Sequence, residues 1–363
     1  ITVFTIVEEY FVIKRIEWLD FGKGITMLLV VLGHVLLGLS QTKLYSGFQL
    51  QTMKYIVVVL YATHMPIFFA LSGYIYALKK NRFSSKRLVT FNLRKLLALG
   101  IPYVLFSVIY WLLKRIGSGS SRIKFTLSDL VNIYKSPLEY LWFLYTLFFV
   151  FLLISVLDTI LKNTIRVSVV LLMRYLMVSA FPIFPFFIQR TVIWALFFYC
   201  GKLLHLYSKL LASKTLLMIA TVVVVIFMSF RIYQPATTDM GIDYSNLGLY
   251  QTLVSLAIVL IAFKLFSSMS TSTSVFDYFD KIGPITLTIY LIHVPFESVF
   301  RIVLLHLGLS TLWLQIILGV VISWYFSLAC QYVINKITWL DFLFYPARYI
   351  TETDLEKFVF GSK

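Results

Sequence analysis

Ten apolar runs, each close to the length needed to cross a lipid bilayer, divide this chain along its whole length. A spanning helix needs about 20 mostly apolar residues, and lipid forces it to satisfy its own backbone hydrogen bonds. The runs are 24–39, 55–78, 96–113, 141–157, 167–188, 191–206, 215–230, 247–266, 284–305 and 311–334. They predict an all-α, polytopic membrane helical bundle of about ten transmembrane helices, in which Pro182 and Pro185 can shorten or bend the fifth.

The composition supports a membrane protein and argues against a nucleic-acid-binding one. Hydrophobic residues make up 60% of the 363 positions and charged residues only 13%, unlike a soluble globular domain. The net charge of +16 comes from Lys and Arg that lie mostly between the apolar runs, so no separate basic domain exists to hold a duplex. Cys200 and Cys330 lie in apolar runs without metal-ligand spacing. We expect membrane lipids as partners, no nucleic acid and no metal.

The basic residues also predict how the chain is oriented. With the N-terminus inside, 21 of the 32 Lys and Arg residues fall on inner segments, nine on outer segments and two within helices. Loops rich in Lys and Arg stay in the cytoplasm, so this bias favours an N-in and C-in topology. We expect one transmembrane domain over 1–363, with a basic cytoplasmic loop at 79–95 and a C-terminal cytoplasmic tail at 335–363.

Two histidines in the first and second runs are candidate functional groups, because a titratable side chain at membrane depth costs a few kcal/mol. His34 follows Gly33, which leaves room for a neighbouring helix or a ligand. His64 precedes Met65-Pro66, and the proline frees a backbone carbonyl one turn earlier. The alternative for both is structural: an interfacial His34 bonded to a carbonyl, and a His64 bonded to the kinked backbone.

A third candidate group lies in the ninth run. His293, Glu297 and Arg301 are spaced by four residues, so they share one helix face and can bond in series. Glu297 and Arg301 can also neutralise each other as a buried ion pair that only fixes helix packing. The sequence leaves both interpretations open.

Five short segments then occur in a fixed order. They are Asp20-Phe-Gly-Lys23 continuing to Leu32-Gly33-His34, His64-Met-Pro-Ile-Phe-Phe-Ala-Leu-Ser-Gly73-Tyr, Arg94-Lys95 leading to Ile101-Pro102-Tyr103, Leu141-Trp142-Phe143-Leu144, and Tyr290-Leu-Ile-His293. In these segments the chain resembles the acyltransferase family 3 membrane proteins, especially the branch typified by fucose 4-O-acetylases. The resemblance extends from Asp20 to the tenth run.

This resemblance implies a bacterial plasma-membrane enzyme that moves an acetyl group from cytoplasmic acetyl-CoA to a hydroxyl of a cell-envelope, capsular or secreted polysaccharide, or of its lipid-linked precursor. It assigns His34 as the catalytic base and Lys23 as the basic residue eleven positions earlier; histidine suits the removal of a hydroxyl proton near neutral pH. Asp20 is also expected among the catalytic residues, although about 21 Å of helix rise separates it from His34, so the two cannot touch. His64 is expected to partner His34 or to stabilise the oxyanion.

The donor and the acceptor are expected to bind at different places. Seven basic residues between 79 and 95 suit the phosphates of CoA, and the expected contacts are Lys86, Arg87, Arg94 and Lys95. The family's Arg-x-x-Arg is matched only at its start, and binding to anionic lipid is the alternative. The expected acceptor contacts are Trp142, His293, Glu297 and Arg301.

Two other classes of function compete with an acyltransferase. A ten-helix bundle with buried His, Glu and Arg also suits a transporter or flippase of a lipid-linked sugar, although the sequence shows no inverted repeat. A glycan-binding or assembly subunit that lost its chemistry is the third class, and an intact His34 argues against it. Hydrolysis or transfer of the acetyl group of acetyl-CoA by the purified protein separates the three.

Overall fold

The computed structural model describes residues 15–78, 84–116, 126–181, 185–233 and 248–361, and within these ranges it contains helices and no strand. The α-helices are α1 Glu17–Ser40, α2 Gly47–Leu78, α3 Ser85–Ile116, α4 Leu127–Val131, α5 Trp142–Leu161, α6 Thr164–Ala180, α7 Phe186–Leu206, α8 Lys209–Ala212, α9 Lys214–Tyr233, α10 Leu249–Ser268, α11 Ser274–Ile282, α12 Thr286–His306, α13 Leu312–Ile334, α14 Thr338–Phe344 and α15 Glu352–Phe360. Short 3-10 turns are η1 Asn132–Tyr134, η2 Glu139–Leu141, η3 Gly283–Ile285 and η4 Pro346–Arg348. The predicted all-α class is confirmed.

Eight segments in the described ranges are long and apolar enough to cross a membrane. They are Glu17–Ser40, Gly47–Leu78, Ser85–Ile116, Leu127–Leu161, Phe187–Leu206, Leu249–Ser268, Ser274–His306 and Leu312–Ile334. The other two predicted runs are also helical: α6 has 17 residues, and α9 has 20, of which Lys214–Ser229 form an apolar stretch. The polytopic helical bundle is therefore confirmed, and eight spans within the described ranges are long enough for a full crossing.

The fifth predicted run ends earlier than expected. We expected it to continue to residue 188, but α6 ends at Ala180 and Ile188 belongs to α7. Pro185 is the N-cap of α7, and Pro182 lies outside the described residues. A proline lacks the backbone N–H that a helix interior requires, so the apolar run is divided between two helices.

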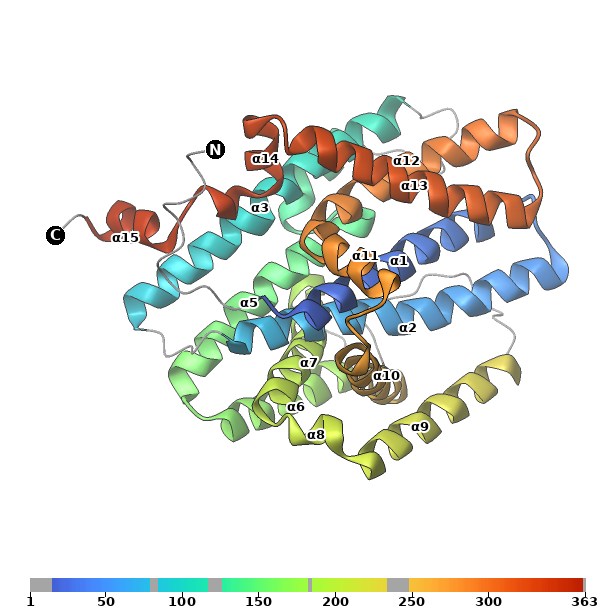
Figure 1. Ribbon diagram of the computed structural model, residues 1–363. Coiled ribbons are helices and arrows are strands. Elements are labelled where there is room, and N and C mark those ends of the chain that lie inside the picture. The colour runs from blue at the N-terminus through green and yellow to red at the C-terminus, as the bar shows by residue number, and fades with distance from the viewer. Residues whose placement is uncertain (1–14, 79–83, 117–125, 182–184, 234–247, 362–363) are drawn as a thin grey trace.

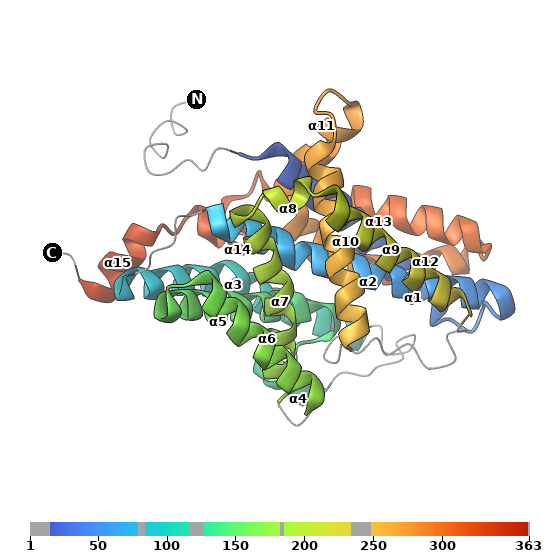
Figure 2. The same ribbon diagram turned by 90° about the horizontal axis from the view of Figure 1, so that it is seen from below.

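Helices α1 and α2 occupy the centre of the bundle. Helix α2 packs against α1, α7 and α10, whereas α1 also contacts α11, α12 and α13. In Figure 1, α12 and α13 lie together on one side of the α1–α2 pair, and α6 and α7 lie on the other. Figure 2 shows α11 standing out from one end of the bundle. The two central helices thus carry His34 and His64 into the middle of the molecule.

The backbones of α2 and α7 touch at a pair of glycines. A Cβ at Gly73 would lie 1.7 Å from the carbonyl oxygen of Phe198, and a Cβ at Gly201 would lie 1.8 Å from that of Ala70. No side chain fits at either position. Small residues let membrane helices approach closely enough for extensive van der Waals contact, which drives helix association in lipid.

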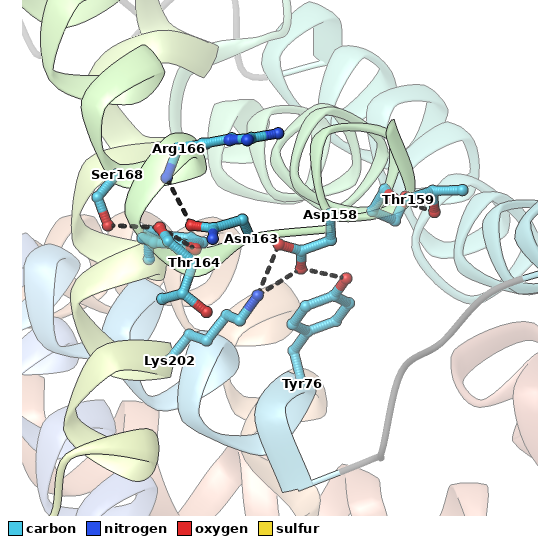
Figure 3. Close-up of polar contacts among 10 residues, drawn as sticks. Tyr76, Asp158, Thr159, Asn163, Thr164, Arg166, Ser168 and Lys202 are labelled. Atoms are coloured by element: carbon cyan, nitrogen blue, oxygen red, sulfur yellow. Dashed lines mark hydrogen bonds and ion pairs between the residues drawn. The ribbon is translucent and has the colours of Figure 1, made fainter. Parts of the chain in front are cut away.

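A buried ion pair joins α5, α7 and α2 (Figure 3). The Lys202 ammonium lies 2.6 Å from both carboxylate oxygens of Asp158, and the Tyr76 hydroxyl donates to the same carboxylate at 2.9 Å. The side chains of Lys202 and Asp158 are only 12% and 9% exposed. Beside this pair Asn163 begins α6 by accepting a hydrogen bond from the Arg166 amide at 3.1 Å.

The segment predicted as a basic loop at 79–95 needs a correction. Residues 79–83 lie outside the described residues, and from Ser85 onward the segment is the first part of α3. Lys, Arg and Leu are good helix formers, so the helix continues past the apolar layer. The predicted tail at 335–363 contains α14, η4 and α15, and these elements pack along α3. Figure 1 shows α15 beside the start of that helix.

We expect Gly73→Ala to destabilise the protein strongly, because the added methyl group would overlap the Phe198 carbonyl and separate α2 from α7. The cost should reach several kcal/mol, as for other overpacked cores. Thermal unfolding of detergent-purified protein measures it. Gly100→Ala is the matched control, because a Cβ there would meet only Leu96 at an ordinary 3.6 Å. Equal unfolding temperatures for the two variants would contradict the close crossing.

We expect Lys202→Met to cost about 3–5 kcal/mol, because it leaves the Asp158 carboxylate buried without its cation. Denaturant titration of the purified protein measures the loss. The double variant Lys202→Met with Asp158→Asn should recover much of the stability, since no uncompensated charge then remains. A single variant as stable as the wild type would show that water reaches this pair.

Candidate active site

Three histidines from three different helices meet in the centre of the bundle. The ring centroids of His34 in α1 and His293 in α12 are 5.1 Å apart. Tyr61 of α2 lies beside two of these histidines. The centroid of its ring is 4.8 Å from that of His64 and 5.8 Å from that of His34. His64 and His293 are fully buried. The structure therefore assembles into one site three residues that the sequence presented separately.

Prolines fix the two helices that carry His64 and His293. Pro66 leaves the Ala62 carbonyl without its helical donor, and the Ser255 hydroxyl of α10 donates to that carbonyl at 3.0 Å. Pro295 likewise frees the Leu291 carbonyl, which accepts from the Tyr140 hydroxyl at 2.9 Å. Each kink is thereby tied to another element, and the histidine next to it is held in place.

The hydrogen bonds of the rings show which nitrogen atoms are available. His293 Nδ1 lies 2.8 Å from the Ile289 carbonyl, which only accepts, so Nδ1 carries the proton and Nε2 of the neutral ring has a lone pair. His34 Nδ1 lies 3.4 Å from the Tyr61 hydroxyl. Among the residues that the structure describes, none bonds to the buried Nε2 atoms of His34, His64 and His293. Buried nitrogens of this kind are rare in folded proteins, and each can bond to a water, a ligand or a substrate proton.

The alternative that a histidine serves only to bond to the backbone holds to a different extent for each of the three. The carbonyl freed by Pro66 is bonded to Ser255, so His64 does not satisfy it. His34 has a tyrosine neighbour at Nδ1 and no backbone carbonyl. His293 does bond to the backbone through one nitrogen and keeps the other.

Close packing around His34 depends on the absence of a side chain at Gly33. A Cβ there would lie 3.3 Å from His64 Cε1, so Gly33 makes room for the neighbouring helix, as predicted. One turn later a Cβ at Gly38 would lie 1.9 Å from Arg301 Nη1. The C-terminal half of α1 is therefore packed closely against both α2 and α12.

Only part of the hydrogen-bonded series predicted for His293, Glu297 and Arg301 is present in α12. Arg301 Nη1 lies 2.7 Å from Glu297 Oε1, and Glu297 is buried. His293 bonds through Nδ1 to the Ile289 carbonyl, and its Nε2 has no partner among the described residues. The structure therefore contains the Glu297–Arg301 ion pair, one and two helical turns beyond the histidine cluster.

An apolar cavity of about 250 Å³ approaches the cluster from the other side. Along α1 it is lined by Lys23, Met27 and Val30, on three successive turns, and it also touches Met65 and Tyr290. Val30 lies four residues before His34, Met65 follows His64, and Tyr290 lies three residues before His293. The cavity therefore extends from Lys23 to within about one helical turn of the three histidines, which do not line it.

Asp20 and Lys23 form a pair at this side of the site. Lys23 Nζ lies 2.9 Å from Asp20 Oδ1, and Arg15 Nε lies 2.9 Å from Asp20 Oδ2. Asp20 therefore fixes the position of the Lys23 side chain, which lines the cavity. It has no contact with His34, as the helix rise predicted.

The four residues expected to bind the donor phosphates do not line this cavity. Arg94 donates to the Ala347 carbonyl at 3.0 Å and lies 3.6 Å from Glu352, so it contacts the C-terminal segment. The Lys86 ammonium lies 5.3 Å from the Phe360 ring centre, in the same segment. The Lys95 ammonium lies 4.1 Å from the Phe151 ring centre. The remaining residue, Arg87, bonds through its backbone N–H to Ser84.

Trp142 packs near the site and outside the histidine cluster. Its ring packs beside the stacked rings of Phe69 and Trp194, at centroid distances of 6.4 and 5.3 Å, and the Arg190 guanidinium lies 5.1 Å from its centre. The residue of this segment that reaches the histidines is Tyr140, whose ring is 6.5 Å from His34.

Sequence reasoning missed Tyr61 and Tyr140. Tyr61 lies three residues before His64, so helical spacing could have placed both on one face. Tyr140 directly precedes the Leu141-Trp142 segment, but only the folded chain shows that it reaches α12.

No group of three His, Cys, Asp or Glu side chains in the described ranges is arranged to hold a metal ion, and this includes the histidine cluster. The site therefore offers imidazoles, tyrosine hydroxyls and an ion pair as its chemical groups. Such groups can accept a hydroxyl proton and stabilise developing charge.

Comparison with known proteins identifies the family of the chain. The sequence profile of the acyltransferase domain of family 3 matches residues 16–332. The nodulation protein NolL of Mesorhizobium japonicum is 30% identical over 140 residues, which cover 39% of this chain and 35% of NolL, so the match spans about a third of that relative. No solved structure matches the chain. Because the family match covers most of its length and the fold is a polytopic helical bundle, the chain belongs to the acyltransferase family 3 of integral membrane proteins.

Proposed function

We propose that this protein is a membrane O-acyltransferase of the bacterial plasma membrane. It moves the acetyl group of acetyl-CoA to a hydroxyl of a cell-envelope, capsular or secreted polysaccharide, or of its lipid-linked precursor. The observation that carries the proposal is the cluster of three histidines whose Nε2 atoms have no partner among the described residues, about one helical turn beyond an apolar cavity that begins at Lys23.

His34 is the proposed general base. When its Nδ1–H donates to the Tyr61 hydroxyl oxygen, 3.4 Å away, its Nε2 lone pair is free to take the acceptor's hydroxyl proton. The acceptor oxygen then attacks the thioester carbonyl, the C–S bond breaks, and the CoA sulfur receives the proton from His34. His64 lies on the adjacent turn of α2, where a ring N–H can stabilise the oxyanion of the tetrahedral intermediate.

The donor is proposed to enter from the side of Lys23. The thin pantetheine arm of CoA suits an apolar cavity of about 250 Å³, and Lys23, held by Asp20, can contact polar atoms at its mouth. Lys86, Arg87, Arg94 and Lys95 remain proposed contacts for the nucleotide phosphates. For Arg94 this requires phosphate to replace Glu352 as its partner.

The acceptor is proposed to bind on the other side of the histidines. His293 offers a lone pair there, and Glu297 and Arg301 offer charged groups that bond to sugar hydroxyls. Trp142 remains a proposed acceptor contact on this side, two residues after Tyr140, whose ring lies 6.5 Å from the His34 ring.

We expect His34→Ala to lower acetyl-CoA turnover at least 100-fold, since general-base catalysis contributes about 10²–10⁴. Purified protein is assayed for acetyl transfer and for hydrolysis of acetyl-CoA. His306→Ala is the matched control, because this exposed histidine ends the same helix that carries His293. Normal turnover in His34→Ala would rule out this base. A wild-type protein with neither activity would favour the transporter, the flippase or the binding subunit.

We expect Lys23→Gln to raise the KM for acetyl-CoA about tenfold, because one charge-assisted hydrogen bond is lost. The double variant Arg94→Gln with Lys95→Gln should raise it as well if α3 binds the phosphates. Lys336→Gln is the control, a basic residue predicted on the same side of the membrane but outside the cavity. An unchanged KM in the double variant would assign Arg94 and Lys95 to topology and packing alone.

A further inference from the structure

Glu139 has a backbone conformation that an ordinary residue adopts only under constraint. It begins η2 with φ 36°, in the left-handed region, and directly precedes Tyr140. Such a conformation costs about 1–3 kcal/mol, persists only where the surroundings enforce it, and is concentrated at functional sites. The contacts that the Glu139 carboxylate makes in this conformation are therefore of functional interest.

The Glu139 carboxylate contacts α3 and is partly exposed at the surface of the bundle. It accepts a hydrogen bond from the buried Tyr110 hydroxyl, and its other oxygen lies 3.6 Å from Lys114 Nζ, one turn further along α3. The Glu139 side chain is 33% exposed and that of Lys114 is 23% exposed. A polar molecule arriving from outside can therefore reach this pair.

The same pair is connected to the histidine cluster. The Tyr110 ring lies 5.2 Å from the Tyr140 ring, and Tyr140 in turn lies 6.5 Å from His34 and 6.3 Å from His293. The path from the exposed carboxylate to the proposed base thus passes through two packed tyrosines.

A second ion pair lies close to the histidines on α12. Arg301 Nη1 lies 2.7 Å from Glu297 Oε1, and Glu297 follows His293 by four residues, about one helical turn. Two carboxylate–cation pairs, Glu139–Lys114 and Glu297–Arg301, therefore lie around the outer side of the histidines. The cavity on the Lys23 side is apolar, so the two sides of the site differ in chemistry.

We propose that Glu139, together with Lys114, binds hydroxyl groups of the acceptor saccharide and so determines which sugar is presented to the histidines. The inference rests on the proposed acyltransferase function. A carboxylate accepts hydrogen bonds from two neighbouring hydroxyls, and an ammonium donates to a third, a combination that suits a polyol. The acceptor's reacting hydroxyl would then satisfy a buried Nε2 that has no partner among the described residues.

The test compares two reactions of the purified full chain: hydrolysis of acetyl-CoA, in which water is the acceptor, and transfer to non-acetylated surface polysaccharide extracted from cells that lack this gene. Glu139→Gln keeps an acceptor atom for the Tyr110 hydroxyl and removes the charge. We expect the KM for the polysaccharide to rise about tenfold or more, while hydrolysis and the KM for acetyl-CoA change less than about twofold. Lys114→Gln should shift the polysaccharide KM in the same direction.

Asp129→Asn is the matched control, because this exposed carboxylate lies in the same segment and accepts hydrogen bonds from Thr126, three residues earlier. A polysaccharide KM in Glu139→Gln equal to that of the control would overturn the inference, and so would an equal loss of transfer and hydrolysis, which indicates a packing role. A wild-type protein without either reaction would instead refute the proposed function itself.

Discussion

The site depends on the rule that a backbone carbonyl in hydrocarbon must find a donor. Two helices break their own hydrogen-bond ladder at prolines, and each freed carbonyl is bonded by a side chain of another element: Ala62 by Ser255, and Leu291 by Tyr140. These bonds fix α2 to α10 and α12 to η2. Since His64 and His293 lie within two residues of the prolines, the bonds that repair the kinks also hold the imidazoles around His34.

The distances between helices are set by positions that have no side chain. Gly73 and Gly201 bring the backbones of α2 and α7 into contact, and Gly38 brings α1 against Arg301. The contacts at Gly73 and Gly201 have no slack, because the neighbouring atoms are backbone, whereas at Gly38 the neighbour is the end of the Arg301 side chain. A rigid frame of this kind keeps groups from separate helices within reach of one hydroxyl, which is what proximity catalysis requires.

The two sides of the histidine cluster are chemically different. From Lys23 to Val30 the cavity along α1 is apolar, whereas beyond the cluster lie Glu297 and Arg301. The proposed transfer from a thin, largely apolar donor arm to a polyol suits this difference. In that proposal the two substrates approach His34 from opposite sides, and the polyol is kept out of the apolar half because its hydroxyl groups would be desolvated there.

The sequence by itself determined the helical bundle, the ten helical runs, the family and the candidate histidines, because hydropathy, proline positions and costly titratable groups are local properties of the chain. It did not determine that Lys95 packs on Phe151 or that Arg94 contacts the C-terminal segment, and it missed Tyr61 and Tyr140. Only the tertiary structure decided these contacts. Which faces of apolar helices meet depends on close packing of side chains far apart in the chain, and hydrophobicity alone does not encode that.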